Sequence, residues 1–213
     1  MAFGRHWEWR GFGYLDAKLR NRIESQPAAF PSSQELVDTY LWSPRSGVNM
    51  KLRAGALKLK RLLSEADGLE EWLEDPSENF AFPISRTQLR ALRDALQVET
   101  LDTTATVIDR TALLDLLKRF VPEVRVIEVA KRRQQYRVDD ADARRTTASG
   151  LSSGVTLEVA EILSPEIITT VGVEHADARA VATICKQFGL ADSLRTLNYL
   201  DAIAAWSRGE HLA

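Results

Sequence analysis

Three pairs of cationic residues, each separated by a single residue, stand in stretches that alternate or nearly alternate cation with apolar residue. They are Lys51 and Arg53, Lys58 and Lys60, and Lys131 and Arg133. If each pair lies on a β-strand, its two side chains point to the same face, because successive side chains alternate. Several strands that each place two cations on one side form a surface for a highly charged anion. This spacing predicts a phosphate-rich ligand, and polyphosphate is the natural candidate.

The residues around these pairs indicate the elements that would position them. A hairpin is expected at 49–63, with its turn at Ala54-Gly55, and further strands at 6–10, 35–42, 124–138, 155–163 and 167–174. Helices are expected from Ser85, where Gln88 completes a capping box, from Asp109, from Asp177 and over about 193–206. Strands, central helices and then strands again indicate one antiparallel α+β domain rather than alternating βαβ units.

The composition and charge of the chain limit the partners and the compartment that we expect. The chain has 213 residues and a net charge of −2, so bulk positive charge does not predict a nucleic-acid partner. No apolar run approaches the length of a membrane span, and the N-terminus lacks the apolar core of a signal peptide. The single cysteine, Cys185, suits a reducing compartment. We therefore expect a cytoplasmic protein without a membrane or nucleic-acid partner, and leave homodimerisation open.

Closing the strands into a barrel with their polar faces inward would collect most of the charged residues in one space. The interior would then hold Arg10, Lys51, Arg53, Lys58, Lys60, Lys131 and Arg133, together with Glu8, Glu158 and Glu174. Seven cations repel strongly in a medium of low dielectric constant, so they need a bound anion or interleaved carboxylates. The alternative is an ordinary half-buried sheet in which the cations face solvent.

Several motifs resemble those of a known family, and they occur in the same order. They are Trp7-Glu8-Trp9-Arg10, Val37-Asp38-Thr39-Tyr40-Leu41-Trp42, Lys51-Leu52-Arg53, Lys58-Leu59-Lys60, Lys131-Arg132-Arg133-Gln134-Gln135-Tyr136, Leu157-Glu158, Val173-Glu174, Gly189-Leu190 and Asn198-Tyr199. Their order resembles that of the CYTH superfamily, the triphosphate tunnel metalloenzymes. The first motif stands where that family has its E-x-E-x-K strand, and the motif from Lys131 is similar to its K-x-R-x-x-Y strand.

The resemblance implies a fold and a set of site residues. The fold would be a closed antiparallel barrel of about eight strands, with helices outside, one domain over 1–213 and a helical insertion at about 65–120. The phosphates would be bound by Arg10, Lys51, Arg53, Lys58, Lys60, Lys131 and Arg133. The resemblance also implies Mg²⁺ or Mn²⁺ held by Glu8, Glu158 and Glu174, with Glu8 or Glu158 positioning or activating water.

Departures from the family pattern leave two functions open. His6 replaces the first glutamate of the signature, Arg10 replaces its lysine, and Ala160 and Gly172 stand where the late strands usually have a second acid. The chain is then either a metal-dependent triphosphatase or a catalytically degenerate module that binds polyphosphate or another polyanion.

A third reading is an unrelated α+β protein whose cationic residues face solvent.

The acidic run that includes Glu70, Glu71 and Glu74 is interpreted as a solvated helix face or loop.

Overall fold

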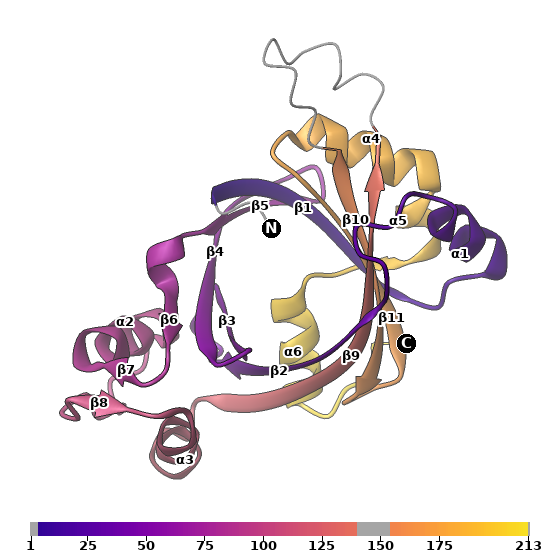
Figure 1. Cartoon of the computed structure of the whole chain (residues 1–213). Helices are drawn as coiled ribbons and strands as arrows, with labels where there is room; N and C mark the ends of the chain where they lie inside the picture. The colour runs from indigo at the N-terminus through magenta and orange to yellow at the C-terminus, as the bar shows by residue number, and fades with distance from the viewer. Residues whose placement is uncertain (1–3, 140–153, 213) are drawn as a thin grey trace.

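Eight antiparallel strands form a closed barrel in the computed structural model, which describes residues 4–139 and 154–212 (Figure 1). The strands are β1 (Gly4–Gly13), β2 (Gln34–Trp42), β3 (Val48–Arg53), β4 (Ala56–Ala66), β5 (Leu69–Glu74), β9 (Arg125–Val138), β10 (Val155–Ser164) and β11 (Ile168–His175). Their order around the barrel is β11-β10-β9-β2-β3-β4-β5-β1, and the pairing of β1 with β11 closes the ring. The expected closed α+β barrel is confirmed.

The barrel has a polar interior and an apolar exterior, which explains the alternation in the sequence. On β3, Met50 and Leu52 are buried in an outer apolar cluster, while Lys51 and Arg53 line the interior. On β1, Trp9 packs outward while Glu8 and Arg10 point inward. Helices cover the apolar outer faces, so the apolar residues of each strand are removed from water by the layer around the barrel.

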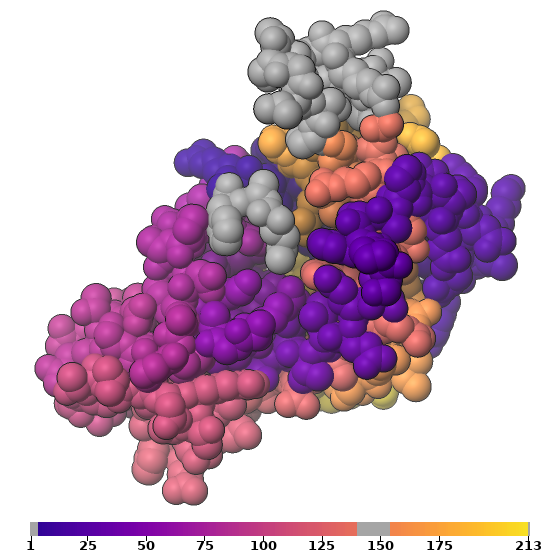
Figure 2. Space-filling view, in the orientation of Figure 1, coloured from indigo at the N-terminus to yellow at the C-terminus, as the bar shows by residue number. Residues whose placement is uncertain are grey.

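Two groups of helices cover opposite parts of the outer surface (Figure 1). Leu19 of α1 (Ala17–Glu24) and Ile184 of α4 (Ala178–Phe188) join the cluster outside β1, β9, β10 and β11. Leu92 of α2 (Arg86–Leu96) and Leu113 of α3 (Arg110–Phe120) join the cluster outside β2, β3 and β4. In the space-filling view, α2, α3 and the segments around them form a lobe beside the barrel (Figure 2).

The helix starts predicted from the sequence are confirmed. Ser85 is the N-cap of α2, and the capping box with Gln88 is present in both directions. Asp109 and Asp177 cap α3 and α4 with their side-chain oxygens. Each of these caps satisfies a backbone N–H that has no partner within its helix.

One end of the barrel is closed by α6 (Tyr199–Ser207). Its Tyr199 and Ile203 pack with Phe12 and Tyr40, which face inward from β1 and β2. Tyr199 stacks on Tyr40 with ring centroids 5.4 Å apart. The helix expected at about 193–206 is therefore shorter, since α5 (Leu190–Ser193) and β12 (Arg195–Thr196) precede it.

The expected helical insertion at about 65–120 is only partly helical. Residues 65–74 instead complete β4 and form β5, which pairs with β4 and β1 and is part of the barrel. Four short elements follow around the two helices: η1 (Pro76–Glu78), β6 (Asn79–Ala81), β7 (Ile84–Ser85) and β8 (Val107–Ile108). Within the described parts of the chain, no helix is long and apolar enough to cross a membrane.

Candidate functional site: a cavity with two oppositely charged walls

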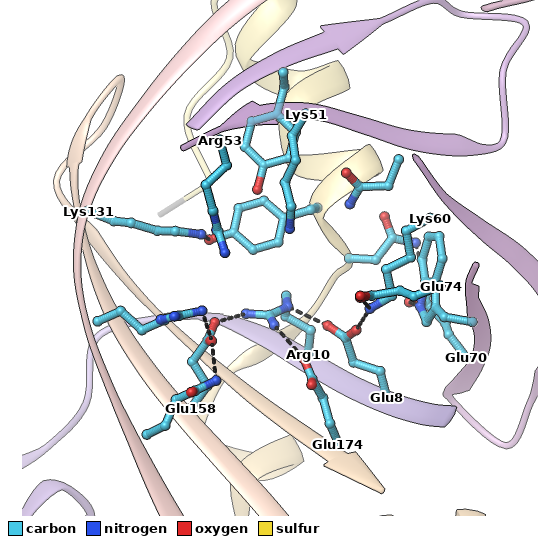
Figure 3. Close-up of a pocket in the computed structure, with 17 residues that line it drawn as sticks. Glu8, Arg10, Lys51, Arg53, Lys60, Glu70, Glu74, Lys131, Glu158 and Glu174 are labelled. Atoms are coloured by element: carbon cyan, nitrogen blue, oxygen red, sulfur yellow. Dashed lines mark hydrogen bonds and ion pairs between the residues drawn. The ribbon is translucent and has the colours of Figure 1, made fainter. Parts of the chain in front are cut away.

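The barrel interior contains a cavity whose positive and negative residues lie mostly on different strands (Figure 3). The strands β4, β3 and β9 supply five cations: Lys60, Lys51, Arg53, Lys131 and Arg133. The adjacent strands β10, β11, β1 and β5 supply five carboxylates: Glu158, Glu174, Glu8, Glu70 and Glu74. We call these two sets the cationic wall and the acidic wall.

The cationic wall is built on the alternation that the sequence predicted. Lys51 and Arg53 share one face of β3, and Lys131 and Arg133 share one face of β9, so each strand points two cations into the cavity. Between them, β2 contributes Asp38, which is fully buried. Asp38 forms a bidentate ion pair with Arg53 and lies 3.2 Å from the Lys131 ammonium. Burial of Asp38 opposes its ionisation, but the Arg53 hydrogen bonds and the charges of Lys131, Lys51 and Arg53 together outweigh burial and hold its pKa well below the usual value.

Lys51 differs from its neighbours because the described residues provide it with no ion pair. Burial, followed by the positive charge of nearby Arg53, lowers its pKa to about 7. A lysine in this state gains and loses its proton near neutral pH. A bound anion would favour the charged form, because it supplies the negative partner that Lys51 lacks in the described residues.

The acidic wall contains one cation of its own, Arg10. Its Nε donates to Glu8 at 2.7 Å, and its Nη1 lies 3.4 Å from both Glu158 and the Thr170 hydroxyl. Its Nη2 lies 3.8 Å from Glu174. The guanidinium thus bridges three carboxylates from three adjacent strands (Figure 3).

These contacts set the protonation of the acidic wall. Burial would raise the pKa of Glu8, but Lys60 and Arg10 outweigh burial and hold it well below the usual value. Burial also opposes ionisation of Glu158, yet Arg10 and the nearby Lys131 lower its pKa to about 2. Glu174 behaves differently, because burial and the neighbouring Glu8 charge raise its pKa to about 7. Glu8 and Glu158 are therefore anions that are already paired with cations of the protein.

Most of the predicted site residues meet in this cavity. The residues that line it are Glu8, Arg10, Lys51, Arg53, Lys60, Lys131, Arg133, Glu158 and Glu174. Lys58 does not line it, although it lies directly opposite Lys51 in the β3–β4 pairing. His6 lines an adjoining pocket with Glu74 and Glu174, and its Nε2 is buried without a hydrogen-bond partner among the described residues. Phosphate contact by any of these cations stays a prediction.

The interpretation of the acidic run as a solvated helix face or loop is wrong for Glu70 and Glu74. Both lie on β5 and line the cavity, where Glu70 accepts hydrogen bonds from the Trp72 indole and the Asn198 amide. Glu70, Trp72 and Glu74 occupy every second position, so their side chains share one face of a strand. This spacing is the signal that could have identified an inward face. Tyr199, which lines the cavity from α6, was also missed as a site residue; its hydroxyl lies 3.0 Å from the Lys131 ammonium.

The predicted metal ligands do not form a vacant coordination site. The described residues include no group of three or more His, Cys, Asp or Glu side chains placed to hold a metal ion. Glu8, Glu158 and Glu174 do converge, but the Arg10 guanidinium lies among them, and Lys60 also binds Glu8. Divalent cations need several free oxygen ligands at short range, so this arrangement does not fit Mg²⁺ or Mn²⁺.

Comparisons with known proteins find solved structures that share the fold of this chain. No protein-family model and no curated protein sequence matches the chain. Among solved structures, a conserved hypothetical protein from Pyrococcus furiosus aligns over 92% of this chain and 98% of its own, with 18% identity and a TM-score of 0.52. The PH1012 protein from Pyrococcus horikoshii OT3 aligns over 91% and 97%, with 17% identity and a TM-score of 0.50.

A third solved structure is described by an activity. HpAC1 from Hippeastrum, a proposed adenylyl cyclase described as having a dominant triphosphatase activity, aligns over 97% of both chains with 11% identity and a TM-score of 0.49. Likeness at this level carries no inference about the activity of the present chain. The shared feature is the fold, which agrees with the closed barrel that the CYTH resemblance implies; membership of the superfamily stays a prediction.

Proposed function

We propose that the barrel binds a triphosphate or longer polyphosphate group against the cationic wall. The observation that carries this proposal is the convergence of five cations from β4, β3 and β9 on one side of the barrel cavity, with Lys51 lacking an ion pair among the described residues. Phosphate oxygens accept charge-assisted hydrogen bonds from ammonium and guanidinium donors. Binding would offset the burial and the repulsion by Arg53 that lower the pKa of Lys51.

A second donor in the cationic wall supports the same ligand. The Arg133 Nε is buried and has no hydrogen-bond partner among the described residues, although its Nη atoms bind Glu158 and Gln34. A buried polar group without a partner is costly, and a bound acceptor would satisfy it. The cationic wall therefore offers both unneutralised charge and an unused hydrogen-bond donor.

Of the two functions that the sequence leaves open, the polyanion-binding module has the stronger support. Hydrolysis with Mg²⁺ or Mn²⁺ would need Glu8, Glu158 and Glu174 as free metal ligands, and each has a cation of the protein as its neighbour. A small phosphate compound as partner, a cytoplasmic location and the absence of nucleic-acid and membrane partners stay predictions. Phosphate release from inorganic triphosphate, with and without Mg²⁺ and Mn²⁺, separates hydrolysis from binding.

Binding is tested by calorimetric titration of the wild-type chain and of Lys51→Met with inorganic triphosphate. We expect saturable binding by the wild type and a loss of about ten-fold in affinity, or about 1.4 kcal/mol, for the variant, because one charged hydrogen-bond donor is removed. Lys118→Met is the matched control, since Lys118 is exposed on α3 outside the barrel. No saturable binding, or equal losses for the two variants, would rule out the cationic wall as the site.

A further inference from the structure

The geometry points to Arg10 as a built-in counter-ion that takes the position of a divalent metal among Glu8, Glu158 and Glu174. This inference deepens the proposed function, because it makes the ligand a phosphate chain free of metal. It departs from the expectation that Arg10 contacts phosphate and that the three glutamates hold Mg²⁺ or Mn²⁺. Its first half, the exclusion of metal by Arg10, does not depend on phosphate binding.

The first argument is the environment of the guanidinium. Arg10 is 6% exposed, and its nitrogen atoms lie 2.7 Å from Glu8, 3.4 Å from Glu158 and 3.8 Å from Glu174. The Tyr199 ring lies against it, with the guanidinium carbon 4.8 Å from the ring centroid. Its directed donors are thus used within the acidic wall (Figure 3), whereas the phosphate is expected at the opposite wall.

The second argument is the space that β11 leaves for this side chain. Gly172 lies directly opposite Arg10 in the β1–β11 pairing. A Cβ atom at position 172 would lie 2.5 Å from Arg10 Nη2 and 2.8 Å from its guanidinium carbon, both shorter than real contacts. The guanidinium therefore occupies the space that a side chain at position 172 would need, and the glycine allows it to lie among the three carboxylates.

The third argument is charge balance. A divalent ion among these carboxylates would lie within a few ångströms of the guanidinium, and the two positive charges would repel each other in a medium of low dielectric constant. The ion would also have to displace hydrogen bonds already made by Glu8 and Glu158. The permanently charged guanidinium cannot lose its proton to relieve this conflict. Metal is excluded as long as Arg10 stays in place.

The test is binding of Mn²⁺ in the absence of any phosphate, measured by loss of the free Mn²⁺ electron paramagnetic resonance signal. We compare the wild-type chain with Arg10→Gln, which removes the charge, and with Arg5→Gln on the same strand, whose side chain is 70% exposed. We expect no loss of the free Mn²⁺ signal with the wild type or the Arg5 variant, and a clear loss of that signal with Arg10→Gln, because the variant removes the positive charge from among the three carboxylates.

Two outcomes would overturn the inference: binding of Mn²⁺ by the wild type, or no gain of binding by a folded Arg10→Gln. If Arg10→Gln does not fold, the wild-type titration decides, with absence of binding supporting the inference. A second arm titrates the wild type with triphosphate in EDTA and in Mg²⁺. Weaker apparent binding is expected in Mg²⁺, because Mg²⁺ complexes triphosphate and leaves less of the metal-free chain, and stronger binding in Mg²⁺ would contradict a metal-free ligand. Failure of triphosphate to bind in both would remove the proposed function and leave the Mn²⁺ result standing.

Discussion

Lys51 and Glu174 face the cavity from opposite walls, and both have pKa values near neutrality. The pKa of Lys51 is lowered to about 7, mainly by burial and by Arg53, and that of Glu174 is raised to about 7, mainly by burial and by Glu8. Loss of a proton from either residue makes the cavity more negative by one charge. Both residues therefore change the charge of the cavity in the same direction over the same pH range.

The affinity for a phosphate chain is expected to decrease as pH rises through neutrality. Below pH 7 Lys51 is charged and Glu174 is neutral, which favours an anion, while above pH 7 Lys51 is neutral and Glu174 is charged. From about pH 6 to about pH 8 we expect a loss of about ten-fold in affinity for inorganic triphosphate, measured by calorimetry.

Triphosphate also titrates, so Lys51→Met serves as the comparison in this experiment. The ligand titrates in the same way with both proteins, whereas the variant lacks the titration of Lys51. The pH profile of the variant should therefore be flatter than that of the wild type. Identical profiles for the two proteins would show that Lys51 does not contribute to the pH dependence.

At the residue scale, the sequence identified most of the charges that enter the cavity, but not which charges neutralise one another. The alternation around Lys51, Arg53, Lys131 and Arg133 follows from strand geometry alone. The pairing of Arg10 with Glu158 joins residues 148 positions apart. Such a contact depends on the order and register of strands around the barrel, which no local pattern specifies.

At the scale of elements, the register between β1 and β11 determines how Arg10 is held. The pairing sets Arg10 opposite Gly172 and Glu8 opposite Glu174. A slip by one residue would turn the inward residues of one strand to the outer face. The acidic wall therefore depends on this pairing as much as on the residues themselves.

Gly172→Ala is expected to destabilise the fold by about 1–3 kcal/mol, because the added methyl group overlaps a guanidinium that cannot move without breaking its ion pairs. Equilibrium unfolding in urea measures the difference. Gly47→Ala is the control, since a Cβ atom at position 47 meets no atom within 4 Å. Equal stability of the two variants would contradict the close packing of Arg10 against β11.

The strand β5 shows why part of the barrel escaped prediction. Its residues Leu-Glu-Glu-Trp-Leu-Glu alternate, but the inward positions Glu70 and Glu74 are acidic and the outward positions 69 and 73 are leucines. In an ordinary globular sheet, charged residues mark the solvent face. Here the interior is the polar side, so an acidic run that resembles a solvated surface belongs to the cavity.

At the scale of the whole molecule, two apolar layers outside the barrel hold the strands, while the cavity carries the charges. Leu92 of α2 is fully buried in the layer that also contains Leu52, Leu57 and Leu59 of the strands. Those strand leucines alternate with the cations of the site. Stability and ligand binding are thus assigned to opposite faces of the same strands.

Leu92→Ala is therefore expected to lower the free energy of unfolding by about 2–5 kcal/mol, the usual cost of a cavity in a packed core. Triphosphate affinity of the folded protein should stay within about two-fold of the wild type, because no cavity charge is changed. Leu163→Ala is the matched control, since Leu163 is 51% exposed, and its effect should be small. Unfolding in urea and calorimetry supply the two measurements, and a large loss of affinity in Leu92→Ala would contradict the division between layers.

The closure of the ring between β1 and β11 has a consequence for how the chain folds. The first strand cannot find its last neighbour until residues near 175 have left the ribosome, since Trp7 pairs with His175. Contacts this distant along the chain slow folding and leave the edge of an incomplete sheet exposed. Before closure, Arg10 also lacks Glu158 and Glu174 as partners. Completion of the barrel during biosynthesis is therefore the step that both removes the last open edge and assembles the charge network.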